Sequence, residues 1–453
     1  MSALLIVFAS AILVLFLGIN KPESAMKWPA VAFLFLAAVA ALTGLDLASW
    51  LTVPESMISY SGMDQLLVSL LCAVGALVIA AFDSLSSKGS DRLGLMMLSL
   101  TGAIMLVGQE NLVMMFLGIE VMSIPLYVLA GSDKQNIFSN EAAMKYFLLG
   151  AFSTAILLLG SAFLYGATGT LVLESMTHKA SMYAHFGVYP PMLVAGLVLL
   201  AVGLLFKVSA VPFHFWAPDV YEGSPTRSTA FMATIVKIAG FSALLRVAMA
   251  FEPMALWYQN AVALLSVLSI IVGNMMALVQ TSPKRMLAYS SIAHAGYMLL
   301  ILLLVGQSQF EAESILYLYL MAYSISSTGA FAWIEWASQR SGKLDFSMFN
   351  GLSSNRWAIV NLVVVFLSLA GIPLTAGFAG KYYLFASAFS IQPIAVGFAL
   401  LGSLLSIAYY FRAFRFAFDE SQESSEAPAF PWVLVIASVA IVLVGCVPMW
   451  FMP

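Results

Sequence analysis

The sequence contains little charge and gives no sign of a charged partner. Only 9% of its 453 residues are Asp, Glu, Lys or Arg, while 62% are hydrophobic; a soluble domain carries about a quarter charged residues. Lys and Arg total 19 against 22 Asp and Glu, for a formal net charge of −3, so nothing indicates a nucleic-acid partner. These proportions exclude a soluble single-core protein and indicate an integral membrane protein.

Cysteine is almost absent. Cys72 and Cys446 each stand alone in an apolar run, so the sequence supports neither a disulfide framework nor the spacing of a zinc or iron–sulfur site. A Walker-type loop, a low-complexity tract and a large soluble domain are also missing. The N-terminus has no basic region before its apolar run and no clear cleavage site, so we expect a retained first span. Any chemistry must come from a few polar side chains.

Long apolar runs dominate the sequence instead. They do not alternate apolar and polar residues as the strands of a membrane β-barrel would. The sequence therefore predicts an all-α integral membrane protein with about fourteen transmembrane helices. With a window of about 19 residues, the segments are 3–20, 28–45, 63–82, 93–108, 111–131, 142–166, 190–222, 226–250, 255–280, 286–306, 313–337, 357–391, 393–416 and 430–451.

Basic residues in the loops predict the orientation of these helices. Loops after odd-numbered segments hold thirteen Lys and Arg residues, whereas loops after even-numbered segments hold only Lys179. Lys and Arg near the ends of spans are retained on the cytoplasmic side. The asymmetry places both termini on the outer side and supports an even number of spans.

Two segments are too long for one crossing of about 20 residues. Segment 190–222 is interrupted by Pro212, and segment 357–391 by Pro373 with neighbouring glycines. Proline breaks a helix and frees backbone groups that lipid cannot satisfy. The pattern therefore predicts that helices 7 and 12 are discontinuous. Because these helices are five apart, helices 4–8 and 9–13 are predicted to form two inverted five-helix repeats.

This topology divides the chain into four parts. We predict three N-terminal helices in 1–92, the first repeat in 93–250, the second in 251–416, and a loop with helix 14 in 417–453. The longest polar stretches, 167–189, 338–356 and 418–428, are interpreted as surface loops.

Four ionisable side chains stand within the apolar segments. Glu120 lies in the middle of helix 5 and Lys237 in the middle of helix 8, while Lys207 precedes the first break and Lys381 follows the second. A charge at bilayer depth costs on the order of 3 kcal/mol or more. A structural reading makes them ion pairs or lysines that reach the interface. Burial lowers the pKa of a lysine and raises that of a glutamate, whereas an opposite charge nearby does the reverse. A buried lysine near a glutamate can therefore have its proton affinity switched, which favours proton translocation. Glu120 would modulate Lys207, and the three lysines would carry protons in succession.

Lys145 and His294 are further candidates. Lys145 follows Glu141 by one helical turn, and such i, i+4 pairs are common structural features, so a structural and a functional role are equally supported. His294 can relay a proton through either ring nitrogen or be a satisfied core histidine. His214, at the first break, could line a water-filled gap or satisfy freed backbone groups.

The motifs around these residues resemble a known family. Over nearly its whole length, the chain resembles the antiporter-like subunits of the bacterial proton-pumping NADH:quinone oxidoreductase, respiratory complex I, and most closely its N-type subunits. A lysine at 381 argues against the M type, and the early end after helix 14 argues against the L type. The segments are FLGIEVMSIPLYVLAG, GLLFKVSAVPFHFWAPDVYEGSPTRSTAFMATIVKIAGF, SPKRMLAYSSIAHAGYMLL and GIPLTAGFAGKYYLF.

The resemblance implies proton translocation in a bacterial cytoplasmic membrane, coupled to electron transfer from NADH to quinone in other subunits. Glu120 and Lys207 would form a charge pair, Lys237 the central relay and Lys381 the terminal lysine, with Lys145 and His294 as further positions of a polar axis. No cofactor is expected in this chain; NADH, flavin, iron–sulfur clusters and quinone would bind elsewhere in the complex. The expected partners are other membrane-arm subunits, especially the neighbouring antiporter-like subunit and the small membrane subunits.

Three alternatives remain at this point. A subunit of a sodium/proton antiporter complex would exchange cations for protons without NADH oxidation. A structural subunit that pumps nothing would tolerate neutral replacements of its buried lysines. A free-standing solute carrier is the weakest alternative, because the sequence has no substrate-pocket signature beyond the buried charges.

Overall fold

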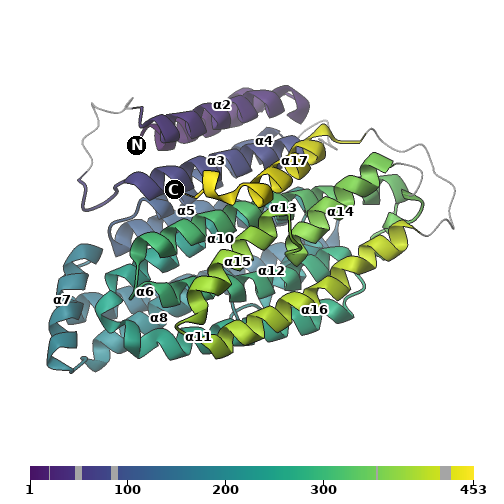
Figure 1. Ribbon diagram of the computed structural model, residues 1–453. Helices are drawn as coiled ribbons and strands as arrows, with labels where there is room; N and C mark the ends of the chain where they lie inside the picture. The colour runs from purple at the N-terminus through teal and green to yellow at the C-terminus, as the bar shows by residue number, and fades with distance from the viewer. Residues whose placement is uncertain (20, 46–53, 83–89, 353–355, 419–429, 453) are drawn as a thin grey trace.

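The helices of the protein run roughly side by side in one bundle (Figure 1). The computed structural model describes residues 1–19, 21–45, 54–82, 90–352, 356–418 and 430–452. Both chain termini lie at the same end of the bundle (Figure 1). The helices are α1 (Ser2–Gly18), α2 (Glu23–Thr43), α3 (Gly62–Ala81), α4 (Ser90–Val107), α5 (Leu112–Ala130), α6 (Ile137–Thr168), α7 (Leu173–Phe186), α8 (Pro191–Lys207), α9 (Trp216–Gly223), α10 (Thr226–Ala250), α11 (Ala255–Val279), α12 (Pro283–Leu299), α13 (Gln309–Ser341), α14 (Arg356–Ala370), α15 (Ala376–Phe389), α16 (Pro393–Ala417) and α17 (Trp432–Cys446).

Each of the fourteen predicted segments coincides with a helix or a pair of half-helices. In the described part of the chain, ten helices are long and apolar enough to cross a membrane. Together with the shorter apolar helices α1, α8, α14 and α17, they account for the fourteen predicted segments. The structure thus confirms the predicted all-α membrane fold, and the shared end of the two termini agrees with an even number of crossings.

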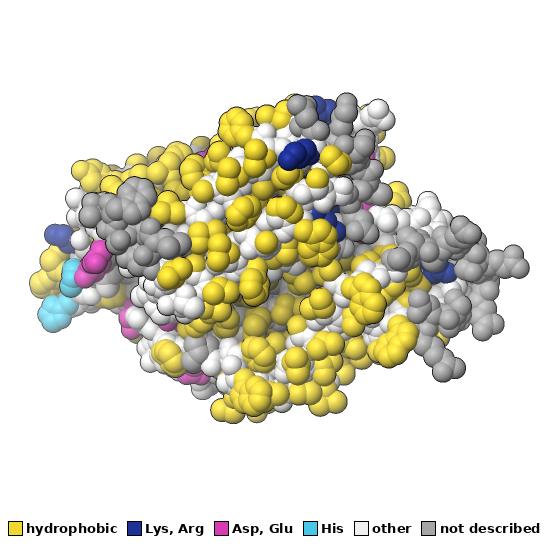
Figure 2. All heavy atoms as spheres, turned by 90° about the horizontal axis from the view of Figure 1, so that it is seen from above, with side chains coloured by type: hydrophobic (Ala, Val, Ile, Leu, Met, Phe, Trp, Pro, Cys, Tyr) yellow, Lys and Arg dark blue, Asp and Glu magenta, His cyan; other side chains and the backbone are white. Residues whose placement is uncertain are grey.

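The outside of the bundle is apolar. Phe16, Phe152 and Leu404 are each more than 60% exposed. Hydrophobic side chains spread over the face seen in Figure 2, whereas histidine and acidic side chains stand out at one end. Monomeric soluble proteins rarely expose apolar patches of this extent. This surface suits contact with lipid and with other membrane subunits.

The interpretation of residues 167–189 as a loop was wrong, because α7 forms there. Leu173, Met176 and Ala180 recur at helical spacing and are buried, and Gly187 ends the helix in the left-handed conformation with φ of 64°. The helix lies at one end of the bundle and runs across the direction of its neighbours (Figure 1). It therefore covers the helix ends rather than crossing the membrane.

Both predicted helix breaks are present. The first separates α8 from α9, with Ser209 at a φ of 59°. The second separates α14 from α15, with Gly371 at a φ of 82°. In each break, a buried side chain donates to a carbonyl freed at the end of the first half-helix: the Trp216 indole to Phe206 O at 3.0 Å, and the Lys381 ammonium to Ala370 O at 2.8 Å. In a continuous helix, backbone N–H groups of the following turn would donate to these carbonyls; here the two side chains donate instead.

Glycines allow several helices to pack closely. A Cβ on Gly160 of α6 would lie 2.5 Å from the backbone nitrogen of Leu200 on α8, and one on Gly196 of α8 would lie 2.8 Å from Leu164 N. A larger side chain at either position would push the two helices apart. Small residues serve the same purpose in many membrane bundles.

The two predicted repeats have the same layout. The first consists of α4, α5, α6, α8 with α9, and α10; the second consists of α11, α12, α13, α14 with α15, and α16. In both, the fourth member is discontinuous, and five crossings make the second unit start from the opposite side. The predicted boundary between 92 and 93 falls inside α4, and those at 250 and 416 fall at or next to helix ends. Most of the predicted loop 418–428 lies outside the described residues.

Candidate functional site

Lys207 is buried between α8 and α5. Its side chain is 2% exposed, and its ammonium donates to Ser123 Oγ at 2.9 Å and to the Tyr127 hydroxyl at 3.5 Å. Both partners lie on α5, one and two turns after Glu120. Lys207 ends α8, so the break places its charge next to the carbonyl end of that half-helix, where a cation is favoured.

Glu120 lies beside this group without touching the lysine. Its carboxylate accepts a hydrogen bond from Thr154 Oγ1 on α6 at 2.8 Å, and its side chain is only partly buried. Among the described residues, Glu120 and Lys207 form no ion pair within 4 Å; Ser123 takes the place of the carboxylate. The structure thus places the Lys207 ammonium against α5, the helix that carries Glu120, but does not show the direct contact between Lys207 and Glu120 that the resemblance implies.

Lys237 lies in the middle of α10 and is 1% exposed. Its ammonium donates to the backbone carbonyl of Ser291 on α12 and lies 5.6 Å from the centre of the Tyr323 ring on α13. The Tyr323 hydroxyl in turn donates to Ser291 Oγ at 3.0 Å. Lys237 is therefore held where α10, α12 and α13 meet.

His294 continues this group toward the second break. It follows Ser291 by three residues on α12, and its Nδ1 is 2.9 Å from the Tyr319 hydroxyl on α13. Its ring centre lies 5.0 Å from that of Tyr323, the same ring that faces Lys237. The histidine and the central lysine thus share one tyrosine neighbour.

Lys381 occupies the second break. It is 4% exposed, and its ammonium donates to Leu369 O at 3.1 Å, to Ala370 O at 2.8 Å and to Ser403 Oγ at 3.0 Å. The two carbonyls end α14, so the cation caps the negative end of that half-helix. The Tyr297 ring, one turn beyond His294 on α12, lies 5.2 Å from the ammonium.

The three buried lysines share one kind of environment. Each donates to hydroxyl or carbonyl oxygens and lies within 6 Å of a tyrosine ring centre, a distance at which a cation is attracted by the ring. Among the described residues, none of them has a carboxylate within 4 Å. Neutral acceptors hold an ammonium in place but do not cancel its charge, so a proton can leave without stranding a buried carboxylate.

Lys145 lies outside this buried group. Its side chain is 40% exposed and pairs with Glu141 at 2.7 Å and Asp219 at 2.6 Å. Asp219, on α9, also accepts from Arg285 on α12 at 2.8 Å, and Arg285 reaches Glu222 at 2.9 Å. These ion pairs tie the starts of α6 and α12 to α9, the second half of the broken helix.

Ion pairs also fix both ends of α10. At one end, Arg227 pairs with Glu23 of α2. At the other end, nineteen residues later, Arg246 pairs with Asp64 of α3 and with Glu110, which precedes α5. Burial raises the pKa of the Glu110 carboxyl, while the Arg246 guanidinium acts in the opposite direction. The helix that carries Lys237 is thereby anchored to the N-terminal helices at two levels about 28 Å apart along its axis.

Sequence reasoning missed the hydroxyl partners of the axis. Ser123 follows Glu120 by three residues, Ser291 and Tyr297 flank His294 at three residues on either side, and Tyr323 lies on a separate helix. Hydroxyls at helical spacing from an ionisable residue inside an apolar span would have pointed to the first three. Which helix supplies Tyr323 depends on tertiary packing.

The first break also buries His214. It is 8% exposed, and its Nδ1 has no hydrogen-bond partner among the described residues. Pro212 and Pro373 both lie in the connecting turns, outside the half-helices. No group of three or more His, Cys, Asp or Glu side chains in the described ranges has the arrangement of a metal site.

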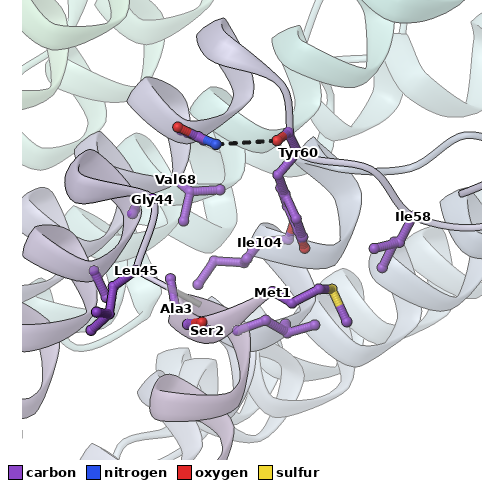
Figure 3. A pocket seen from close by; sticks show the side chains of 13 residues that line it. Met1, Ser2, Ala3, Gly44, Leu45, Ile58, Tyr60, Val68 and Ile104 are labelled. Atoms are coloured by element: carbon purple, nitrogen blue, oxygen red, sulfur yellow. Dashed lines mark hydrogen bonds between the residues drawn. The ribbon is translucent and has the colours of Figure 1, made fainter. Parts of the chain in front are cut away.

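A cavity of about 290 Å³ opens at the end of the bundle that holds the chain termini. Met1, Ser2, Tyr60 and Ile104 are among its lining residues, and the Tyr60 side chain points into it (Figure 3). Beside it, the Gln65 amide donates to the Tyr60 carbonyl at 3.3 Å. None of the predicted axis residues lines this cavity.

Comparison with known proteins gives consistent matches along the chain. The family described as "NADH:quinone oxidoreductase/Mrp antiporter, TM" matches residues 109–406. NADH-quinone oxidoreductase subunit N of Cytophaga hutchinsonii is 37% identical over 447 residues, covering 96% of this chain and 94% of the relative. The subunit of the same name from Salinibacter ruber is 38% identical over 452 residues, covering 94% of this chain and 88% of the relative.

Solved structures match equally well. A chain of respiratory complex I from Thermus thermophilus with bound aureothin superposes with a TM-score of 0.83 at 34% identity, covering 100% of this chain and 98% of that one. A chain of the membrane-bound sulfane sulfur reductase, an archaeal respiratory membrane complex, superposes with a TM-score of 0.86 at 25% identity, covering 99% and 94%. The arrangement of helices is therefore shared by membrane subunits of different respiratory complexes.

Proposed function

The chain belongs to the NADH:quinone oxidoreductase/Mrp antiporter family and, within it, to the subunit N family, and from this premise we propose how it moves protons as a membrane-arm subunit of an NADH:quinone oxidoreductase. Lys207, Lys237, His294 and Lys381 form its proton-carrying axis, and Glu120 modulates the first of them. The redox reaction takes place in other subunits of the complex. The chain lies in a bacterial cytoplasmic membrane with both termini on the outer side.

One observation carries this proposal. Three lysines and a histidine, on α8, α10, α12 and α15, are buried at 1% to 4% exposure, and the lysines are bonded to neutral oxygens. Burying such groups costs several kcal/mol each in a membrane protein, and a structural bundle has no use for cations without counter-ions. Proton transfer requires sites of this kind, since each must exist in both charge states.

Electrostatic coupling supplies the driving step. Two charges about 10 Å apart at an effective dielectric constant of about 20 interact with roughly 1.7 kcal/mol, which is more than tenfold in a protonation equilibrium. Charging one lysine therefore disfavours charging the next. A change of charge at Glu120 acts electrostatically on Lys207, whose ammonium is bonded to two hydroxyls of the same helix, α5. The tyrosine hydroxyls near Lys237, His294 and Lys381 offer the path for the proton itself.

Lys237→Ala in the assembled complex tests the proposal. Inverted membrane vesicles are supplied with NADH, and proton uptake is recorded together with NADH oxidation after a native gel has confirmed assembly. We expect proton uptake per NADH to fall, with a loss on the order of tenfold in the rate carried by this subunit, because removing a proton carrier typically costs at least that much. Normal uptake would refute the proposal.

Lys179→Ala is the matched control, because Lys179 is an exposed lysine on α7. It should leave proton uptake unchanged. A sodium/proton antiporter would instead show cation-dependent proton exchange in the same vesicles without NADH. A structural subunit would tolerate Lys237→Ala with full uptake and intact assembly.

A further inference from the structure

An apolar groove of about 1000 Å³ runs along the outside of the bundle between α14 and α17, which pack against each other (Figure 1). Hydrophobic side chains make up nearly all of its wall. On α17 the lining extends from Trp432 to Leu443, which corresponds to roughly 16 Å along the helix axis. The hydrocarbon core of a bilayer is about 30 Å thick. The groove is therefore about as long as one leaflet of the bilayer is deep.

The two polar side chains that line the groove are bonded inside the protein. Asn361 Oδ1 accepts a hydrogen bond from the Trp333 indole of α13 at 2.7 Å. Its Nδ2 donates to Leu434 O and to Ser438 Oγ on α17, both at 2.6 Å. These bonds tie α13, α14 and α17 together beneath the groove. An occupant of the groove therefore meets apolar surface and does not have to supply a hydrogen bond at membrane depth.

The walls of the groove lack the small residues through which helices of this protein pack closely. Gly160 and Gly196 let α6 and α8 approach each other, and Gly445 brings α17 against the second break, where a Cβ would lie 2.4 Å from the carbonyl carbon of Thr375. Close contacts between membrane helices generally use such residues. The described lining of the groove includes no glycine or alanine, and its one serine is bonded to Asn361. A flexible hydrocarbon chain therefore fits these walls better than a helix of a partner subunit does.

Two tryptophans stand at one end of the groove. Trp357 lies at the start of α14 and Trp432 is the first residue of α17, and their side chains are 80% and 78% exposed. Tryptophan is enriched at the headgroup level of membranes, where its ring contacts hydrocarbon and its N–H group reaches the polar region. In the orientation proposed above, both helices begin on the cytoplasmic side. The two tryptophans therefore mark the headgroup level of the cytoplasmic leaflet.

We propose that this groove binds one phospholipid of the cytoplasmic leaflet, with its acyl chains between α14 and α17 and its headgroup at the level of Trp357 and Trp432. A chain in the groove contacts protein on both sides and beneath, whereas a chain on a convex helix surface contacts protein on one side only. Dispersion contacts add up along such a chain, so this phospholipid is held more firmly than those of the surrounding bilayer. The binding does not depend on the function proposed above; only the choice of leaflet rests on the orientation given there.

Photo-crosslinking in the assembled complex tests the site. The photoreactive residue p-benzoylphenylalanine replaces Trp432 in one variant and, in another, Trp28, an exposed tryptophan of α2 that does not line the groove. Each complex is purified in detergent and irradiated, and the mass of the subunit is measured. We expect the chain with the probe at 432 to gain the mass of one phospholipid. The chain with the probe at 28 should gain none, because a lipid held only by the bilayer is exchanged for detergent.

Val360→Phe tests whether the groove itself holds the lipid. Val360 lines the groove one turn after Trp357 and is more than half exposed, so a phenylalanine there fills part of the groove without entering the packed interior. It should remove the phospholipid adduct of the probe at 432, while the complex still assembles and oxidises NADH. Val198→Phe is the matched control, because Val198 is an exposed valine of α8 that does not line the groove. This variant should keep the adduct.

Any of the following results would overturn the proposal. A crosslink from position 432 to another subunit would show that a partner helix occupies the groove, and an adduct with the mass of a quinone would show an isoprenoid ligand instead. Detergent adducts alone, or equal phospholipid adducts at 432 and 28, would show that no lipid is held more firmly there than elsewhere. An adduct that survives Val360→Phe would place the lipid outside the groove. None of these results bears on Lys237→Ala, which tests proton translocation separately.

Discussion

Gly371 should determine where the terminal lysine of the axis sits. It follows the end of α14 at a φ of 82°, and a Cβ built on it would lie 2.7 Å from Lys381 Cδ and 3.1 Å from Lys381 Nζ. Gly371→Ala must therefore either move the lysine or shift the break. We expect it to lower proton translocation in the manner of a Lys381 variant, although position 371 carries no chemistry itself.

The magnitude follows from two contributions. Alanine in the left-handed region costs about 1 to 2 kcal/mol relative to glycine. Moving the ammonium breaks at least one of its bonds to Leu369 O, Ala370 O or Ser403 Oγ, and a hydrogen bond to a charged group contributes about 1.5 to 3 kcal/mol. Together they make the variant break less stable than the native one by about 3 to 5 kcal/mol, and the contact of 2.7 Å between the new Cβ and Lys381 Cδ forces the change.

NADH-driven proton uptake by vesicles with a native gel for assembly measures the effect. Gly397→Ala on α16 is the control, because a Cβ there meets nothing within 4 Å. A double-mutant cycle with Lys381→Ala separates the two contributions when stability is measured as the temperature at which the complex disappears from native gels: in the Lys381→Ala background, Gly371→Ala should cost only the strain at φ. Uptake by Gly371→Ala equal to that of Gly397→Ala would refute the argument that this glycine positions Lys381.

Two further substitutions address how the bundle is held together. Asp64→Ala removes one of the two carboxylates that pair with Arg246. Breaking a buried pair costs about 3 to 5 kcal/mol; because the side chains of Asp64 and Arg246 are 10% and 19% exposed, we expect a loss of stability of about 2 to 3 kcal/mol. It is measured as a lower temperature at which the complex disappears from native gels, and Asp64→Glu should recover part of it. Gly160→Ala places a Cβ 2.5 Å from Leu200 N, so the overpacking of α6 and α8 should cost about 1 to 3 kcal/mol and reduce the yield of assembled complex. Gly166→Ala should be tolerated, because it meets only the flexible end of a methionine side chain, and equal yields for both glycine variants would contradict the packing argument.

Proline and length were sufficient to predict both helix breaks. A span of 33 or 35 residues cannot cross a bilayer once as a straight helix, and Pro212 and Pro373 marked where each interruption falls. Hydrophobicity was equally sufficient for the fourteen segments. It failed at α7 because that helix is polar overall, although the spacing of Leu173, Met176 and Ala180 and the glycine at 187 were present in the sequence. A search for apolar runs alone overlooks amphipathic helices outside the spans.

The partners of the predicted site residues could not be derived in the same way. Hydrogen bonds between helices depend on rotation and crossing angles, which a single sequence does not encode locally. Hence the resemblance could indicate Lys207 and Glu120, but not that Lys207 bonds to Ser123 and Glu120 to Thr154. Likewise, the spacing of Lys145 from Glu141 indicated a local pair, and only the fold adds Asp219 of α9 as its second partner.

Lys145 and the buried lysines differ in the partners of their ammonium groups, and this difference agrees with the separate roles proposed for them. Lys145 is bonded to two carboxylates, so losing its proton would leave negative charges facing a neutral amine, and its charge is held constant. Lys237 and Lys381 are bonded to carbonyl and hydroxyl oxygens, which accept from an amine as well as from an ammonium. For them the cost of deprotonation is only a weaker hydrogen bond. Partners of this type keep the position of the nitrogen fixed while its proton comes and goes, which is the property that a relay requires.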